Sequence, residues 1–204
     1  TEGEVRRALR LLGSARGLLL APAFAVVGGA GLGKSQLAAE LTDGTDDTPA
    51  GVFVMGVDLH RGSSLDDLTA RIPGLPAETF DHLLEAVDAA GARLGARIPI
   101  VIDGLGEAER PAEWQPLLAR LVPVLDRFTN VLLILTLRKS AVEVVPDKFH
   151  RVELEWADSS VDEAVSRYFA HYLIDPGAAR LPMGLFANPL YLRMFCEATN
   201  SDRQ

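Results

Sequence analysis

The chain has 204 residues, of which 48% are hydrophobic and 24% charged, and its 28 acidic and 20 basic side chains give a net charge of −8. This composition fits one globular domain with a small appended subdomain, disfavours direct binding to DNA or RNA, and contains no run of the ~20 apolar residues that a membrane span needs. A single cysteine, Cys196, excludes an intrachain disulfide, and the four scattered histidines disfavour a zinc site. The single cysteine makes a reducing, cytoplasmic setting the expectation. Because the chain begins with Thr1 and shows no leader-like segment, nothing suggests secretion, and we expect a fragment of a longer protein.

Strand and helix patterns alternate through the first three quarters of the chain. Apolar, β-branched runs predict strands, and apolar residues at a spacing of three to four predict helices. The expected strands cover 24–27, 52–57, 98–102, 131–135 and 149–154, and 52–57 is expected to be covered on both faces. The expected helices cover 2–12, 34–41, 65–72, 77–94 and 114–128, and turn residues over 42–51 predict a loop. This order predicts a parallel sheet between two layers of helices.

The pattern changes after Trp156. A helix is expected from Asp158 or Ser159 to about Leu173, followed by turns at 175–177 and 182–184 and a last helix over 189–198. No strand is predicted here. We therefore expect an α/β core over 1–156 and a helical subdomain over 157–204.

A glycine-rich loop follows the first expected strand. Residues 26–40 read VVGGAGLGKSQLAAE, and Gly28, Gly33, Lys34 and Ser35 match G-x-x-x-x-G-K-[ST] between an apolar strand and a helix. In such a loop, backbone N–H groups and the helix N-terminus bind phosphate oxygens, lysine balances the β and γ phosphates, and the serine hydroxyl binds Mg²⁺. The alternative is a glycine-rich turn with a chance lysine. The expected nucleotide contacts here are Gly28, Gly29, Ala30, Gly31, Leu32, Gly33, Lys34, Ser35 and Gln36.

The stretch IPIVIDGLGEAE supplies candidates for a metal anchor and a base. Asp103 ends the third expected strand at the carboxyl edge of the sheet, where it could hold Mg²⁺ through water. Glu107 could orient or deprotonate the attacking water, unless Glu107 and Glu109 only begin a solvated loop. Residues 103–106 also match the D-x-x-G element of GTPases, but the sequence has no N-K-x-D string, which favours adenine over guanine.

The stretch LLILTLRKS places Thr136 and Arg138 at the carboxyl end of the fourth expected strand. If that strand lies between the phosphate-loop strand and the Asp103 strand, both residues face the γ-phosphate, where an arginine can detect or stabilise charge. The alternative for Arg138 is a basic residue that ends a strand.

These motifs, in this order, resemble the NACHT branch of the STAND class of signal-transducing P-loop ATPases. The phosphate loop is GGAGLGKS, VIDGLGE is similar to the NACHT strand-end pattern with Glu107 as its final acid, and LTLR makes Arg138 look like the sensor arginine. ANPLYL resembles the G-x-P element, in which Pro189 would touch the adenine or its sugar, although proline also suits a first helical position by itself. Two positions depart from the pattern: Gly106 stands where many NACHT domains have an acid, and Ala187 replaces a glycine.

The resemblance implies a P-loop NTPase fold of the ASCE type: a three-layer α/β sandwich with a five-stranded parallel sheet, followed by a small helical subdomain that begins a lid. It implies ATP or ADP with Mg²⁺ as cofactors, metal binding by Ser35 and Asp103, and catalytic roles for Lys34, Asp103, Glu107 and Arg138. It also implies slow hydrolysis by a switch that self-associates in its ATP state and is fused to effector and sensor domains. The output of such a switch would be defence signalling or transcriptional control, and the sequence does not choose between them. An AAA+ motor or loader and a P-loop small-molecule kinase stay as alternatives.

Overall fold

The computed structural model describes residues 20–45, 48–58, 64–70, 72, 79–154, 161–177, 179–200 and 202. The helix predicted over 2–12 and the cap predicted at Asp158 or Ser159 lie outside these residues. The chain divides into two compact units. The sheet unit is formed by the described residues of Thr1–Val27 and Ser35–Val152, and the loop-helix unit by those of Gly28–Lys34 and Glu153–Gln204.

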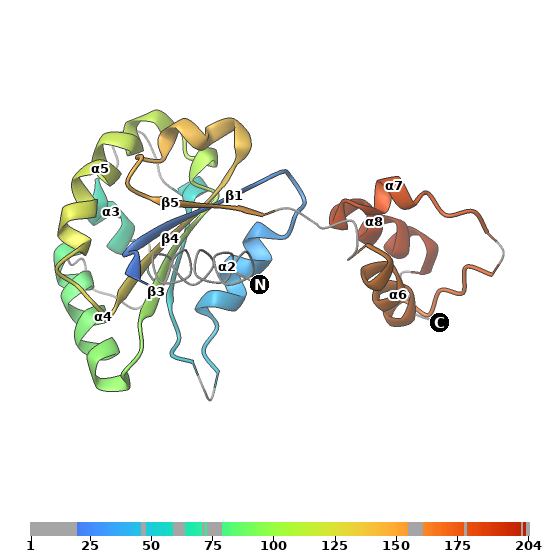
Figure 1. The fold of residues 1–204 in the computed structure, drawn as a ribbon, viewed down its shortest axis with the longest axis horizontal. Coiled ribbons are helices and arrows are strands. Elements are labelled where there is room, and N and C mark those ends of the chain that lie inside the picture. The colour runs from blue at the N-terminus through green and yellow to red at the C-terminus, as the bar shows by residue number, and fades with distance from the viewer. Residues whose placement is uncertain are drawn as a thin grey trace, which may run out of the picture. The chain divides into compact units, whose positions relative to one another are not determined.

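Five strands form one sheet (Figure 1). They are β1 (Ala23–Gly28), β2 (Val52–Met55), β3 (Ile98–Asp103), β4 (Val131–Arg138) and β5 (His150–Leu154), in the spatial order β2-β3-β4-β1-β5. The pairs β2–β3 and β3–β4 are parallel, with Val54 opposite Ile102 and Ile100 opposite Leu133. The predicted α/β fold with a five-stranded sheet is confirmed, and so is the placement of the fourth strand between the first and the third.

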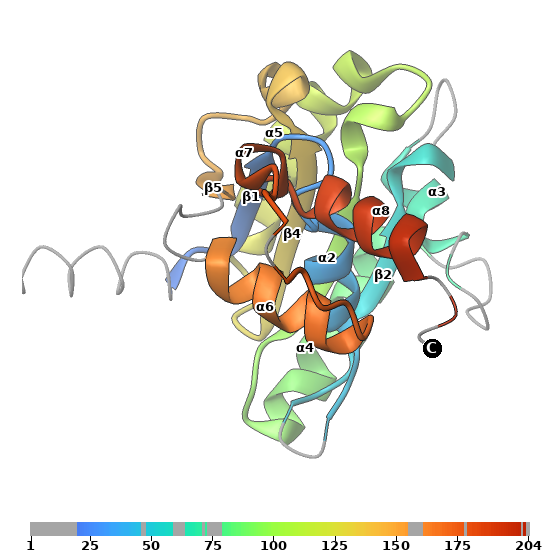
Figure 2. The ribbon, with the colours of Figure 1, turned by 90° about the vertical axis from the view of Figure 1, so that its right-hand side faces the viewer.

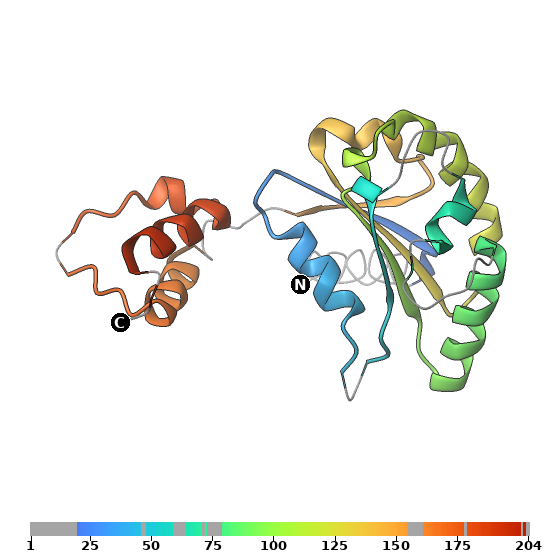
Figure 3. The same ribbon diagram turned by 180° about the vertical axis from the view of Figure 1, so that it is seen from behind.

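Helices cover both faces of the sheet (Figures 1 and 3). One face carries α4 (Phe80–Leu94) and α5 (Trp114–Leu125), and the other carries α2 (Lys34–Thr42), while α3 (Leu65–Thr69) packs against α4. The ends of α4 are set by local chemistry. The Thr79 hydroxyl accepts a hydrogen bond from the His82 amide at the N-terminus, and Gly95 takes a left-handed conformation (φ 65°) at the C-terminus.

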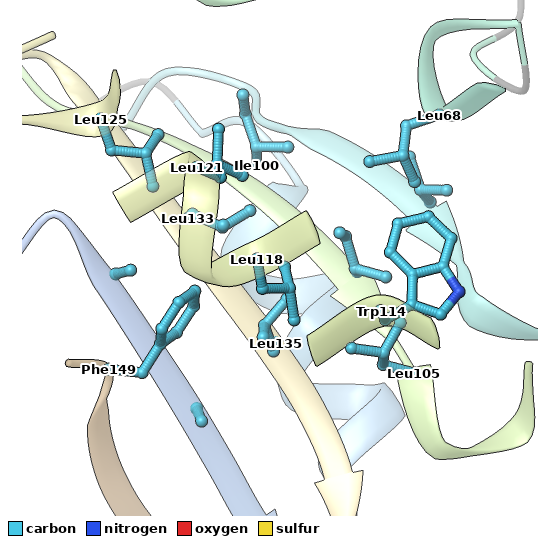
Figure 4. Packing of buried hydrophobic residues seen from close by; sticks show 14 of the residues in the cluster. Leu68, Ile100, Leu105, Trp114, Leu118, Leu121, Leu125, Leu133, Leu135 and Phe149 are labelled. Atoms are coloured by element: carbon cyan, nitrogen blue, oxygen red, sulfur yellow. The ribbon is translucent and has the colours of Figure 1, made fainter. Parts of the chain in front are cut away.

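The core of the sheet unit lies between the sheet and the helices α4 and α5. Leu118, Leu121 and Leu125 recur on one side of α5 and are at most 1% exposed. They pack with the buried cluster that includes Leu133 and Leu135 of β4 (Figure 4). Burial of such side chains stabilises the fold by roughly 1.5–3 kcal/mol each, which holds β4 firmly in the centre of the sheet.

The strand β2 differs from its prediction. It ends at Met55, which is 48% exposed, and residues Gly56–Asp58 form a 3₁₀ turn, η1. The prediction of a strand through Val57 that is covered on both faces is wrong. Among the described strands β2 lies at the edge of the sheet beside β3, and Val54 is its one fully buried residue. A Cβ on Gly56 would stand 2.5 Å from the Gly104 carbonyl oxygen, so the turn requires glycine where it passes the end of β3.

Other boundaries also move. The helix α3 ends at Thr69 instead of 72, α4 begins after its Thr79 cap instead of at 77, and α5 ends at Leu125 instead of 128. The strand β4 runs to Arg138 instead of ending at 135, because pairing within the sheet can extend a strand beyond its apolar run. The turn expected at 182–184 instead begins a short helix, α7 (Met183–Phe186).

The loop-helix unit contains α6 (Val161–His171), α7 and α8 (Pro189–Asn200), which pack on one another (Figure 2). Its apolar centre includes Val165, Phe169, Phe186 and Leu192. The Phe169 and Phe186 rings meet edge to face with centroids 6.2 Å apart, a favourable aromatic geometry. The described residues from 161 onward contain no strand, and α8 begins at Pro189 as predicted. The predicted domain boundary at 156 stays a prediction.

Candidate nucleotide-binding site

The glycine-rich loop runs from the last residue of β1, Gly28, to the first residue of α2, Lys34. Gly31 (φ 77°) and Gly33 (φ 81°) adopt left-handed backbone conformations that other residues rarely take. The first turn of α2 contains no acidic side chain, so the positive end of the helix dipole is not offset there. This combination forms a backbone suited to binding an anion.

The side chain of Lys34 folds back over the loop. Its ammonium Nζ donates hydrogen bonds to the carbonyl oxygens of Gly29 at 2.7 Å and Gly28 at 3.2 Å. The positive charge is therefore held against the loop itself, where it can balance the charge of a bound phosphate group.

Two further residues of the predicted contact set lie in the first turn of α2. The Ser35 side chain is exposed. The Gln36 amide donates to Glu40 Oε1 at 2.9 Å, a pairing along the helix surface. Nucleotide contact by these residues stays a prediction.

Asn188 contacts the loop and was missed by the sequence predictions. Its side-chain amide donates to the Ala30 carbonyl oxygen at 3.2 Å, and its Oδ1 accepts from the Leu190 amide at 3.0 Å. The available signal was an asparagine directly before the proline that begins a helix, a typical N-cap position. The predicted contact residue, Pro189, is the first residue of α8 and follows Asn188 directly.

At the carboxyl ends of β3 and β4, two buried polar side chains hold each other. The Thr136 hydroxyl of β4 donates to Asp103 Oδ1 and accepts from the Gly104 amide at 2.9 Å. Asp103 is 7% exposed and Thr136 1%. The structure therefore shows Thr136 orienting the Asp103 carboxylate, and its predicted contact with nucleotide stays a prediction.

The candidate base and the candidate sensor are an ion pair. Glu107 lies on a 3₁₀ turn, η2 (Leu105–Glu107), and its Oε1 accepts a hydrogen bond from Arg138 Nη2 at 2.8 Å. Both side chains are about half exposed, at 51% for Glu107 and 56% for Arg138. Two predicted residues from neighbouring elements are thus brought together, while Glu109 is exposed on the chain that follows.

Close packing restricts position 106 to glycine. A Cβ on Gly106 would stand 2.7 Å from the Ala141 Cβ of η4 (Lys139–Val144), a separation that real Cβ atoms do not reach. An acidic side chain at position 106 would force η2 away from η4.

The residues fit a nucleotide with magnesium. The Ser35 hydroxyl and the Asp103 carboxylate are the hard oxygen ligands that Mg²⁺ prefers, usually together with water and phosphate oxygens. The described residues include no group of three or more His, Cys, Asp or Glu side chains that could hold a metal ion by themselves. A bound Mg²⁺ would therefore depend on the phosphates for most of its ligands.

Comparisons with known proteins support the fold. No family model and no curated protein matches the chain. Among solved structures, a DNA replication initiation factor is similar to it with a TM-score of 0.53 and 14% identity, over 95% of this chain and 60% of that chain. The chain has an α/β fold of the P-loop type. At this identity the likeness concerns the fold alone, and the chain spans 60% of the length of that structure.

The P-loop fold explains why the motifs of this chain are dispersed. The loop follows β1, and the neighbouring strands β4 and β3 carry Thr136, Arg138 and Asp103.

Within the described residues, none of the helices has the length and apolar character for crossing a bilayer.

Proposed function

We propose that this chain binds ATP or ADP with Mg²⁺ at the glycine-rich loop and acts as a slow, regulatory ATP hydrolase within a longer signalling protein of the NACHT type. The observation that carries the proposal is the hydrogen-bonded pairing of the motif residues. Thr136 and Arg138 of β4, the neighbour of the phosphate-loop strand, bond to Asp103 and Glu107 respectively. The residues that we propose as metal anchor, base and charge detector thus come from separate parts of the chain and take part in these two hydrogen bonds.

In this proposal each side chain has one task. Lys34 and the loop amides bind the β and γ phosphates, and Thr136 keeps the Asp103 carboxylate oriented toward the metal position. Glu107 accepts a proton from the attacking water, and Arg138 stabilises charge on the γ-phosphate. Bound Mg²⁺ would polarise the phosphate oxygens and offset their charge.

Slow turnover follows from the pairing of Glu107 with Arg138. While its oxygen accepts the hydrogen bond from the guanidinium, the Glu107 carboxylate is less available to orient a water molecule. The pair is exposed and contributes only about 0.2–1 kcal/mol, so it can open when a γ-phosphate competes for the arginine. A reversible pairing of this kind suits a switch better than a fast motor.

The second candidate is a motor or loader ATPase, which is favoured by the likeness in fold to a DNA replication initiation factor. The net charge of −8 opposes direct contact of this segment with nucleic acid, so such an activity would depend on other parts of a longer protein. Self-association in the ATP state belongs to both candidates. The two differ in turnover and in the bound nucleotide.

The first experiment measures nucleotide binding by calorimetry with ADP and with ATP–Mg²⁺. We expect Lys34→Ala to weaken binding about tenfold to a hundredfold, because it removes hydrogen bonds to charged groups worth roughly 1.5–3 kcal/mol. The matched control is Lys148→Ala, which removes an exposed lysine far from the loop in sequence. Equal affinity of the parent chain and Lys34→Ala would reject the binding site.

The second experiment separates the candidates. The purified chain is run on a sizing column with and without ATP, its co-purified nucleotide is identified, and its turnover is measured. Retained ADP with negligible turnover supports the switch, whereas fast hydrolysis by a ring supports the motor. Phosphate transfer to an added metabolite would reject both in favour of a kinase.

A further inference from the structure

Asn188 connects the phosphate loop to α8 through both ends of its side-chain amide. Oδ1 accepts from the Leu190 amide at 3.0 Å, so it caps the first turn of α8. Nδ2 donates to the Ala30 carbonyl oxygen at 3.2 Å, across a sequence separation of 158 residues. The Asn188 side chain therefore gives a hydrogen-bond acceptor to a backbone N–H in the first turn of α8 and at the same time holds the loop at Ala30.

The neighbouring residue of the loop fits closely against the same helix turn. A Cβ on Gly31 would stand 2.7 Å from both Asn188 Oδ1 and the Leu190 Cβ. Only a glycine allows this approach, so the hydrogen bond at Ala30 and the packing at Gly31 act on consecutive residues. The loop and α8 accordingly belong to the same compact unit.

The bond to Ala30 has a consequence for anion binding. The Ala30 carbonyl and the Gly31 N–H belong to one planar peptide unit and point in opposite directions across it. Holding the carbonyl oxygen toward Asn188 therefore aims the Gly31 N–H away from Asn188. A loop of this type binds phosphate through such backbone N–H groups.

We propose that Asn188 is a positioning residue for phosphate binding: it sets the orientation of the Ala30–Gly31 peptide and thereby couples the occupied loop to the first turn of α8. This inference rests on the proposed function, because it names the residue through which bound nucleotide acts on the helical segment. A phosphate that binds the Gly31 N–H acts on the same peptide unit that Asn188 holds through Ala30, and the same side chain caps α8.

The test separates the two roles of Asn188, which are capping α8 and holding the Ala30 carbonyl oxygen. Asn188→Ser is uncharged, keeps an oxygen that caps α8, and removes the amide donor that reaches Ala30. Asn188→Asp serves as a second variant if serine lowers the melting temperature, because aspartate is an equally good cap without an N–H donor. The matched control is Asn200→Ser, which removes a similar bond from Asn200 Nδ2 to the Tyr172 carbonyl oxygen (2.9 Å) in the same unit.

The Kd for ADP is measured by calorimetry. Hydrogen exchange is measured for the loop 28–34 without nucleotide, and for the first turn of α8 both with and without ADP. We expect Asn188→Ser to speed exchange in the loop, to weaken ADP binding about twofold to tenfold, and to remove the ADP-dependent protection of α8. Asn200→Ser should change none of these. Loop exchange and ADP affinity equal to those of the parent chain would overturn the inference alone, whereas a parent chain that binds no ADP would reject the proposed function with it.

Discussion

Arg138 Nη2 lies 2.8 Å from Glu107 Oε1 and joins the end of β4 to the turn that follows β3. Because both side chains are about half exposed, the pair contributes little to the stability of the fold, about 0.2–1 kcal/mol. The pair matters for the proposed reaction. Arg138 is proposed to detect the γ-phosphate, and Glu107 is proposed to activate water. While they are hydrogen-bonded to each other, neither side chain is free for its proposed task.

Glu107→Gln should leave ATP bound but slow its hydrolysis by about a hundredfold to ten-thousandfold, the usual contribution of a general base. Glutamine keeps the size of the side chain and its hydrogen bond from Arg138 but cannot accept the proton of water. Turnover is measured as phosphate release and binding by calorimetry. The control is Glu109→Gln, two residues further on; if that variant loses turnover and Glu107→Gln does not, Glu109 is the base.

Arg138→Ala should weaken the preference for ATP over ADP, because the arginine is proposed to contact only the γ-phosphate. We expect a change of about fivefold to a hundredfold in the ratio of the two Kd values, with little change in the Kd for ADP. The control, Arg110→Ala, breaks a similarly exposed ion pair with Glu113 (3.1 Å). An unchanged ratio in Arg138→Ala would show that Arg138 does not detect the γ-phosphate.

Thr136→Val should lower the free energy of unfolding by about 1–3 kcal/mol, because Asp103 and the Gly104 amide lose a buried partner. It should also raise the Mg²⁺ concentration needed for ATP binding, since the Asp103 carboxylate is no longer oriented. Urea unfolding and a Mg²⁺ titration measure the two effects. Thr69→Val removes a comparably buried hydroxyl that bonds the Asp66 carbonyl oxygen at 2.7 Å; we expect it to lower stability without altering the Mg²⁺ dependence.

Cys196 should react slowly with a disulfide reagent in the folded protein. Its side chain is 0% exposed, and burial, followed by the charge of Glu197, raises the pKa of the thiol above its usual range. A raised pKa lowers the thiolate fraction at any given pH, so the reaction should speed up as the pH rises. We expect the folded chain at pH 8 to react at least about tenfold more slowly than the chain in urea. Equal rates would show that α8 opens readily.

The position of the glycine-rich loop between a strand and a helix was predictable because its pattern is local. Gly28, Gly33 and Lys34 lie within a few residues of one another, and the conformation they allow depends mainly on the glycines themselves. The alternation of strands and helices was predictable for a similar reason, since apolar periodicity reflects which face of an element is buried. Boundaries were less predictable. The strand β4 continues through Thr136 to Arg138, beyond its purely apolar run.

The pairings within the candidate site depend on contacts between residues far apart in the chain. Thr136 meets Asp103 across 33 positions and Asn188 meets Ala30 across 158, and no local pattern specifies either distance. They arise because burial of apolar side chains places β4 beside β3, and because the loop packs in one unit with α8. The sequence by itself determines the residue types and the glycine-rich loop. The partner of each side chain follows from long-range packing, which alone brings distant polar groups within hydrogen-bond distance.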